Sequence, residues 1–203
     1  MKLIAIQGLK GSFHHEASNH FFKDDFMLVE CETFLEVADA VTEGKADFGV
    51  MAIENSLAGC IIPNYSLLRR AEVEVVGEVG LRVKLNLMAL VETSLEQIQE
   101  AHSHQMAIRQ CGNFFKDHKQ IKLVEAFDTA GSAKMIGGEK RINTAAIAGS
   151  LAAEIYGLKI IQSGIEDHDL NYTRFLVIQK NGFQQVDHPN KVSIYFQTKH
   201  DAG

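Results

Sequence analysis

The order of strand-like and helix-like segments constrains the fold of this chain most. Apolar runs of strand length alternate with amphipathic, helix-like stretches over residues 2–7, 13–23, 27–30, 34–44 and 46–53. Such an alternation predicts a parallel sheet flanked by helices. Ligands of these sheets bind beyond the carboxyl ends of the strands. Residues 8–12 and 54–56 lie at two such ends, so we expect these two polar loops to be neighbours.

A second unit follows with the same alternation. Extended runs and helix-like stretches are predicted at residues 73–79, 81–90, 95–101, 105–118, 121–127, 128–138, 143–149, 150–157 and 158–162. A last strand begins near Asn171 and is expected to return to the first unit. We therefore predict an α/β protein with two lobes, mainly parallel sheets and a cleft between the lobes. The chain is expected to cross between lobes near residues 77–82 and 163–171.

Charge and composition exclude several classes of partner. The net charge is −6 and the basic residues are scattered, whereas a nucleic-acid surface needs clustered positive charge. No apolar run approaches the ~20 residues that span a membrane. The first residues are interpreted as a strand rather than a signal peptide. Three widely spaced cysteines predict free thiols and a cytoplasmic protein.

The glycine-rich loop after the first strand has two interpretations. Gly8, Gly11 and Ser12 lack the spacing of a phosphate loop or a dinucleotide motif. They fit a tight turn in which Ser12 caps the next helix. They also fit an anion site formed by backbone N–H groups at that helix start. The nearby histidines show no metal-ligand spacing, because His14 and His15 face different sides of a helix, so we interpret them as structural or surface residues.

Other polar residues lie at predicted strand ends. Glu54, Asn55 and Ser56 follow an apolar strand and fit either a turn or a functional site, since a carboxylate there is costly without a partner. Asp128 and Thr129 precede a helix and fit capping, although their position at a strand end also suits a ligand site.

The segment Asn171-Tyr172-Thr173-Arg174-Phe175 is the hardest to explain by structure alone, because it places hydrogen-bonding groups on a core strand. Strand alternation puts Thr173 on one face and Arg174 on the other. A structural ion pair of Arg174 is the alternative to a role in a site.

Taken together, the segments resemble prephenate dehydratases, lyases of phenylalanine biosynthesis that convert prephenate to phenylpyruvate, water and CO2. The resemblance covers about residues 4–180 and is carried by GLKGSFHHEA, IENSLAG, SHQMAIRQC, FDTAGSA, AAIAGSLAAEIYGL and NYTRFLVI. IENS and N-x-TRF, in this order, are its specific part. The resemblance implies a two-lobed α/β fold related to type II periplasmic binding proteins, with the site in the cleft.

The resemblance also implies which residues form the site. Thr173 corresponds to the family's key catalytic residue, and the motifs around it and around IENS supply further candidates. The catalytic candidates are Thr173, Glu54, Asn55 and Ser56. The substrate-binding candidates are Arg174, Asn171, Gly11, Ser12, Ser103, His104, Gln110 and Thr129.

The chemistry needs no cofactor or metal, because aromatisation supplies the driving force. We expect Thr173 to donate a hydrogen bond to the departing hydroxyl. Glu54 is a candidate proton source if burial raises its pKa. Arg174 either binds a carboxylate or braces the motif through an ion pair. A non-catalytic clamshell that binds a carboxylate or an amino acid is the alternative function.

The expected organisation follows from these segments. Residues 1–180 form the catalytic domain, with lobe 1 at about 1–76 and 171–180 and lobe 2 at about 77–170. Residues 181–203 are expected to be a linker and the first strand, at 191–198, of a truncated ACT-like regulatory domain, which makes feedback by phenylalanine doubtful. The resemblance further implies a homodimer or homotetramer that acts on prephenate, with neither a nucleic-acid nor a membrane partner.

Overall fold

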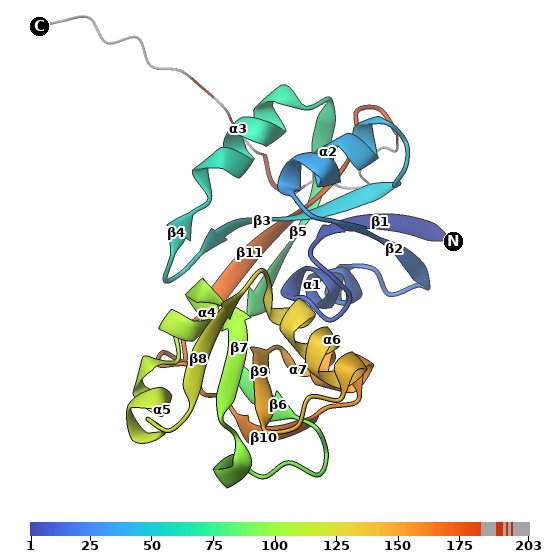
Figure 1. Cartoon of the computed structure of the whole chain (residues 1–203). Helices are drawn as coiled ribbons and strands as arrows, with labels where there is room; N and C mark the ends of the chain where they lie inside the picture. The colour runs from blue at the N-terminus through green and yellow to red at the C-terminus, as the bar shows by residue number, and fades with distance from the viewer. Residues whose placement is uncertain (184–189, 193, 195, 197–203) are drawn as a thin grey trace, which may run out of the picture.

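The computed structural model describes residues 1–183, 190–192, 194 and 196. These residues form two α/β lobes, each built on one sheet, with the first lobe above the second in Figure 1. The predicted strand at residues 191–198 falls partly on positions outside the described residues, and no strand is assigned to those that are described.

The first lobe contains both the first and the last strand among the described residues. Its sheet has the order β2-β1-β3-β11-β5, and β4 pairs with β3. The strands are β1 (Lys2–Gln7), β2 (Phe26–Cys31), β3 (Phe48–Asn55), β4 (Gly59–Cys60), β5 (Val73–Arg82) and β11 (Tyr172–Lys180). The helices are α1 (Phe13–Phe21), α2 (Phe34–Thr42) and α3 (Ile62–Arg70).

The second lobe is continuous in sequence. Its sheet has the order β10-β6-β9-β7-β8. The strands are β6 (Asn86–Ala89), β7 (Glu100–His104), β8 (Lys122–Ala126), β9 (Thr144–Ala148) and β10 (Lys159–Ser163). The helical segments are a 3₁₀ turn (Leu95–Gln97), α4 (Gln105–Arg109), α5 (Gly112–Asp117), α6 (Thr129–Glu139) and α7 (Ser150–Tyr156).

Two predictions about the elements need correction. The sheets are mixed rather than mainly parallel: β2-β1-β3 and β8-β7-β9 are parallel, while β11, β5, β6 and β10 run antiparallel to their neighbours. The reason is that the chain leaves the first sheet along β5 and re-enters it along β11. The predicted helix at residues 105–118 is two short helices, which separate at Gln110 and Cys111.

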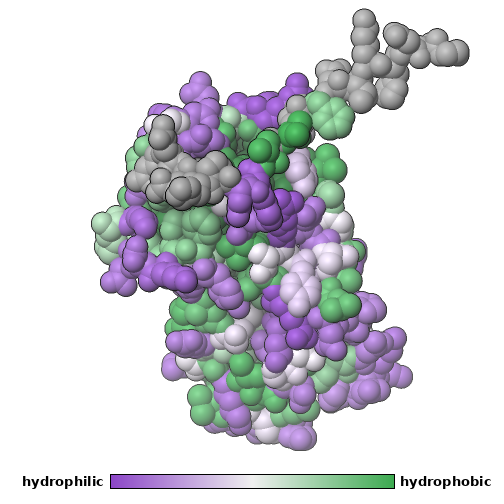
Figure 2. Space-filling view, turned by 180° about the vertical axis from the view of Figure 1, so that it is seen from behind, coloured by the Kyte–Doolittle hydropathy of each residue, from purple (hydrophilic) through white to green (hydrophobic). Residues whose placement is uncertain are grey.

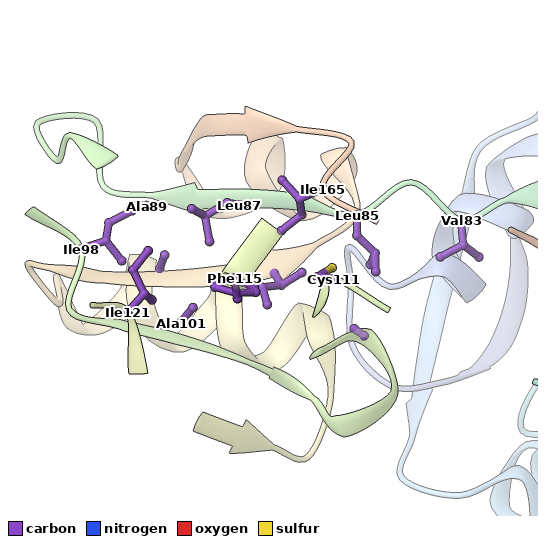
Figure 3. Packing of buried hydrophobic residues seen from close by; sticks show 13 residues of the cluster. Val83, Leu85, Leu87, Ala89, Ile98, Ala101, Cys111, Phe115, Ile121 and Ile165 are labelled. Atoms are coloured by element: carbon purple, nitrogen blue, oxygen red, sulfur yellow. The ribbon is translucent and has the colours of Figure 1, made fainter. Parts of the chain in front are cut away.

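The crossing from the first lobe to the second begins after Arg82, later than residues 77–82, because β5 pairs with β11 as far as that residue. The two crossing segments bind each other, with Val83 N–H donating to Asn171 O at 2.7 Å and Ile165 N–H donating to Leu85 O at 2.9 Å. In Figure 3, Leu85 and Val83 continue the apolar cluster of the second lobe toward the first.

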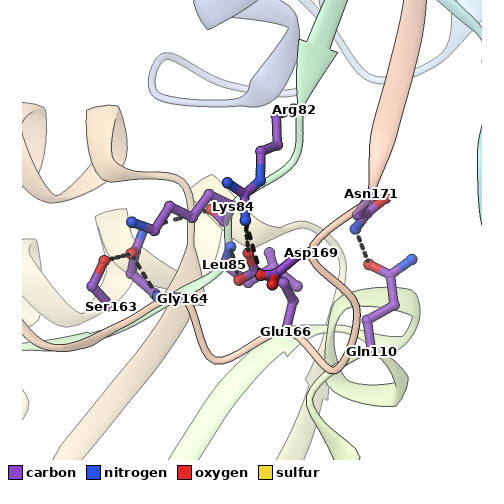
Figure 4. Close-up of polar contacts among 10 residues, drawn as sticks. Arg82, Lys84, Leu85, Gln110, Ser163, Gly164, Glu166, Asp169 and Asn171 are labelled. Atoms are coloured by element: carbon purple, nitrogen blue, oxygen red, sulfur yellow. Dashed lines mark hydrogen bonds and ion pairs between the residues drawn. The ribbon is translucent and has the colours of Figure 1, made fainter.

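A buried carboxylate also ties the two crossings together. Glu166 accepts a hydrogen bond from Leu85 N–H at 2.9 Å and lies 3.6 Å from the Arg82 guanidinium, which also contacts Asp169 at 3.0 Å (Figure 4). The Glu166 side chain is only 2 % exposed, so the ion pair and the backbone donor compensate for its burial.

The lobes also meet on the side away from the crossings. The Tyr156 hydroxyl on α7 donates to the carbonyl of Lys10 at 2.7 Å, and burial raises the pKa of Tyr156 to about 12, so the donor stays protonated. Gly11 lies against Ala152 so closely that a Cβ would stand 2.9 Å from the Ala152 Cα. The cleft is therefore bounded by crossings on one side and by a contact between lobes on the other.

No helix among the described residues is long and apolar enough to cross a membrane. Viewed from behind, charged and polar side chains cover much of the molecule, with apolar side chains interspersed (Figure 2).

Candidate active site

A cavity of about 400 Å³ is lined by residues of both lobes and of the first crossing. It lies where strands β1, β3, β7 and β8 end, as expected for sheets of this kind. Its polar lining consists of Gln7, Ser12, His14, Asn55, His104, Gln110, Asp128, Thr129 and Thr173. Its apolar lining includes Phe13, Phe34, Ile61, Val83, Leu85, Met106, Phe127 and Phe175.

Thr173 is a wall residue of this cavity at the first turn of β11, and its side chain is 9 % exposed. Its Oγ1 accepts a hydrogen bond from the Asn55 amide at 2.9 Å. Because Asn55 is the donor, the hydroxyl hydrogen of Thr173 remains to be donated elsewhere, and no described residue accepts it. Thr173 therefore offers an O–H donor held on a rigid strand.

The orientation of the Asn55 amide is fixed by its own backbone turn. Asn55 Oδ1 accepts from the N–H groups of Leu57 at 3.0 Å and Ala58 at 2.9 Å. Its Nδ2 must therefore face β11, where it reaches Thr173, the carbonyl of Tyr172 and the side chain of Asn171. The turn after β3 thus makes Asn55 the donor to Thr173, so Thr173 cannot donate its own hydroxyl hydrogen to Asn55.

Asn171 carries this network across the cleft. It is fully buried; its Oδ1 accepts from Asn55 at 2.8 Å and its Nδ2 donates to Gln110 Oε1 at 3.0 Å (Figure 4). Gln110 belongs to the second lobe, so the amide chain joins both lobes behind the cavity. The oxygen of Gln110 is thus occupied, whereas its amide nitrogen has no partner among the described residues, and the residue lines the cavity.

Three further predicted residues line the cavity at helix starts. Ser12 caps α1 by accepting from His15 N–H at 3.3 Å, and His104 caps α4 by accepting from Met106 N–H at 3.2 Å. Thr129 is the first residue of α6, which Asp128 caps through Gly131 N–H. These residues thus lie at helix starts and also line the cavity.

Two predicted substrate-binding residues lie outside the cavity lining. Gly11 has a φ of +87° and packs against the second lobe, as described above. Ser103 is fully buried and donates to the carbonyl of Ile147 at 2.6 Å. Gly11 and Ser103 therefore contribute to the packing around the cavity and do not line it.

Glu54, Ser56 and Arg174 do not reach this cavity. They line a separate hollow of about 420 Å³, which Asn55 and Thr173 also border. Arg174 binds Glu78 at 2.7 Å and Glu54 at 3.1 Å, which agrees with its predicted position on the opposite strand face. Ser56 binds the backbone of Leu170 and Tyr172. In this geometry Arg174 braces the motif through its two ion pairs, and Glu54 lines the neighbouring hollow rather than the cavity.

Sequence reasoning missed His14 and the apolar wall, whereas the ligand-site alternative given for Asp128 agrees with its place in the lining. His14 was interpreted as structural or surface, yet it lines the cavity and is 8 % exposed. Its position on the inner face of α1 is visible in the sequence, but the cavity in front of it is not. Among the described residues, no group of three or more His, Cys, Asp or Glu side chains could hold a metal ion.

Comparison with known proteins identifies the family of this chain. The prephenate dehydratase family model matches residues 4–182. An arogenate dehydratase/prephenate dehydratase of Arabidopsis thaliana is 37 % identical over 98 % of this chain and 48 % of its own length. A bifunctional chorismate mutase/prephenate dehydratase of Buchnera aphidicola is 28 % identical over 98 % of this chain and 53 % of its own. The chain thus spans about half the length of these relatives.

Solved structures give the same result. The prephenate dehydratase of Staphylococcus aureus superposes with a TM-score of 0.76 at 31 % identity, over 92 % of this chain and 68 % of that one. A protein described as a novel type of quorum quenching acylase superposes with a TM-score of 0.80 at 32 % identity, over 89 % and 64 %. From the match over residues 4–182 and these likenesses, the chain belongs to the prephenate dehydratase family.

Proposed function

We propose that this chain catalyses the decarboxylative dehydration of prephenate to phenylpyruvate, with Thr173 as the donor to the leaving hydroxyl. The observation that carries the proposal is the direction of the Asn55–Thr173 hydrogen bond. Asn55 donates to Thr173 Oγ1 at 2.9 Å, so the threonine O–H is available to a molecule in the cavity.

Neutral groups have to hold the dianionic substrate, because the described residues that line the cavity include neither lysine nor arginine. The first turns of α1 and α6 open on the cavity at Ser12 and Thr129, and the N–H groups of a helix start attract anions. The Gln110 amide adds a further donor. The aromatic and aliphatic wall, which includes Phe34 and Phe175, suits the apolar ring of prephenate.

The reaction needs little covalent help from the protein. The bond from the ring to its carboxylate breaks and CO2 leaves, and the bonding electron pair moves into the ring. The ring then becomes aromatic as the carbon–oxygen bond to the hydroxyl breaks, and the hydroxide takes up one proton to leave as water. A fixed O–H donor at the departing oxygen stabilises the negative charge that develops there.

Arg174, Glu54 and Ser56 support this donor from behind in the proposed mechanism. The ion pairs of Arg174 hold β11 to β3 and β5, and Ser56 holds the segment that leads into β11 through the carbonyl of Leu170. These contacts fix the position of Thr173 without touching the substrate.

The test is turnover of purified protein, followed as phenylpyruvate absorbance in alkali. The proposal predicts release of phenylpyruvate from prephenate, and no release overturns it. L-Arogenate and an N-acylated quorum signal are assayed in parallel, since relatives carry those activities in their names. Turnover of either of these alone would replace prephenate as the substrate. Binding without turnover would indicate a clamshell binder.

We also propose that the protein is a cytoplasmic homodimer or homotetramer. Free thiols at Cys31, Cys60 and Cys111 suit a reducing compartment, and the oligomer is expected from the family. Light scattering coupled to size-exclusion chromatography checks the assembly, and a monomer at micromolar concentration contradicts it.

A further inference from the structure

His14 is a cavity-wall residue that the mechanism above does not use. It lies in the first turn of α1, and its ring packs between Phe34, at a centroid distance of 5.5 Å, and Phe175, at 5.0 Å. Thr173 lies on the same face of β11 as Phe175, so the imidazole and the threonine hydroxyl border one cavity.

An irregularity in the sheet fixes the tautomer of His14. The register of β3 and β11 shifts between Arg174 and Phe175, so that Ala52 faces Phe175 in the pairing while Ile53 is skipped. The N–H of Ala52 donates to His14 Nε2 at 3.3 Å, and its carbonyl accepts from Asn64 at 2.7 Å. A backbone N–H can only donate, so Nε2 must be the bare nitrogen of the ring.

The ring proton is therefore on Nδ1. Burial lowers the pKa of His14 to about 4, so the ring is neutral at physiological pH and carries one proton. Nδ1 has no hydrogen-bond partner among the described residues. No side-chain nitrogen or oxygen in the described part of the chain is both fully buried and unpaired, so Nδ1 is not sealed off. Because His14 lines the cavity, that cavity is the space on which Nδ1 can open.

We propose that His14 Nδ1–H donates a hydrogen bond to a carboxylate or keto oxygen of the bound substrate and thereby orients it. The identity of that oxygen rests on the proposed function. A neutral donor matters here because no lysine or arginine is found among the described residues of the lining to neutralise the substrate. Glu16 and His20 are on the same helix, but neither lines the cavity.

Two amide substitutions separate the two ring nitrogens. Glutamine can place its oxygen near the position of Nε2 and keep the bond to Ala52, but it offers nothing at the position of Nδ1. Asparagine can place its amide nitrogen near Nδ1, but it leaves the Ala52 N–H without a partner.

We expect His14→Gln to melt close to the wild-type temperature and to lose about 10- to 100-fold in kcat/KM, as for a lost hydrogen bond to a charged group. We expect His14→Asn to melt lower and to keep more of its kcat/KM. A purely structural role predicts the same order of melting temperatures but the reverse order of kcat/KM, because activity would then follow stability. A His14→Gln variant within twofold of the wild-type kcat/KM overturns the inference.

A second measurement does not depend on turnover. ¹⁵N NMR of the wild-type histidines, with the His14 signals assigned from the His14→Gln spectrum, should show a protonated Nδ1 and a bare Nε2. Added phenylpyruvate, the proposed product, should shift the Nδ1 signal. A protonated Nε2, or an Nδ1 signal unchanged at saturating phenylpyruvate, overturns the inference. If the tautomer and the shift are as expected but prephenate is not turned over, only the proposed function is overturned.

Discussion

At the scale of single residues, the function depends on where one hydroxyl hydrogen points. Thr173→Val keeps the branched shape of the side chain and removes the donor, so we expect kcat/KM for prephenate to fall by at least ~10²-fold, as for the loss of one transition-state donor. Thr173→Ser is the matched control, since it keeps the hydroxyl that Asn55 binds. Steady-state kinetics of the three proteins measures the effect, and a valine variant within a factor of two of wild type would remove Thr173 from the chemistry.

The buried ring of His14 makes a separate prediction about stability. Its ordinary pKa is 6.5 in the unfolded chain and about 4 in the folded protein, so the unfolded state binds more protons between these values. The free energy of unfolding should therefore fall by about 3 kcal/mol as the pH drops from 6.5 toward 4, with no contribution above that range. Urea unfolding across this range should show a shallower pH dependence for His14→Gln; parallel curves would contradict the assignment.

Residue patterns predicted part of this site, because strand alternation separates Thr173 from Arg174, which the structure places beside Glu54 and Glu78. The same patterns could not show that Glu54 shares the Arg174 face, since that depends on the register of β11 against β3. They could not show the role of His14 either. The Ala52 N–H is available to His14 at a register shift between β3 and β11, two strands that are distant in sequence.

At the scale of elements, the close contact between α6 and α7 depends on Gly137, one of two adjacent glycines. The sequence predicted that a helix ends at Gly137 and Gly138, yet α6 continues to Glu139 and ends at Lys140 with a φ of 54°. Gly137 is needed for a tertiary reason: a Cβ there would lie 2.5 Å from the carbonyl oxygen of Tyr156. Propensity read along the chain cannot reveal such a close approach.

This contact predicts opposite effects for two similar substitutions. Gly137→Ala should lower the free energy of unfolding by roughly 1–3 kcal/mol, because the helices must separate. Gly138→Ala has no heavy atom within 4 Å of its new Cβ and should raise that free energy by up to about 1 kcal/mol through helix propensity. Chemical denaturation of both variants tests the pair, and equal shifts would refute the packing argument.

At the scale of the whole molecule, the cleft is held from two sides. The crossings bind each other through Glu166 and Arg82, and the far side closes where Lys10 and Gly11 meet α7. The two-lobed plan was predictable from the order of the elements, because a late strand had to return to the first sheet. The contact between Gly11 and Ala152 was not, since it joins a loop of one lobe to helix α7 of the other, and no local pattern relates the two.

The approach of the lobes at Gly11 yields the last prediction. Gly11→Ala forces a residue into a φ of +87° and adds a Cβ 2.9 Å from the Ala152 Cα, so the lobes should part. Gly44→Ala is the control, with a φ of +74° and no heavy atom within 4 Å of the Cβ. Both variants should lose about 1–2 kcal/mol of stability from the left-handed backbone.

Only Gly11→Ala should raise KM for prephenate, by roughly tenfold or more, because substrate binding must then also draw the lobes together at a cost of at least about 1.4 kcal/mol. Small-angle scattering should give a larger radius of gyration for Gly11→Ala than for Gly44→Ala without substrate. Equal radii and equal KM values in the two variants would mean that this contact does not govern how closely the lobes approach.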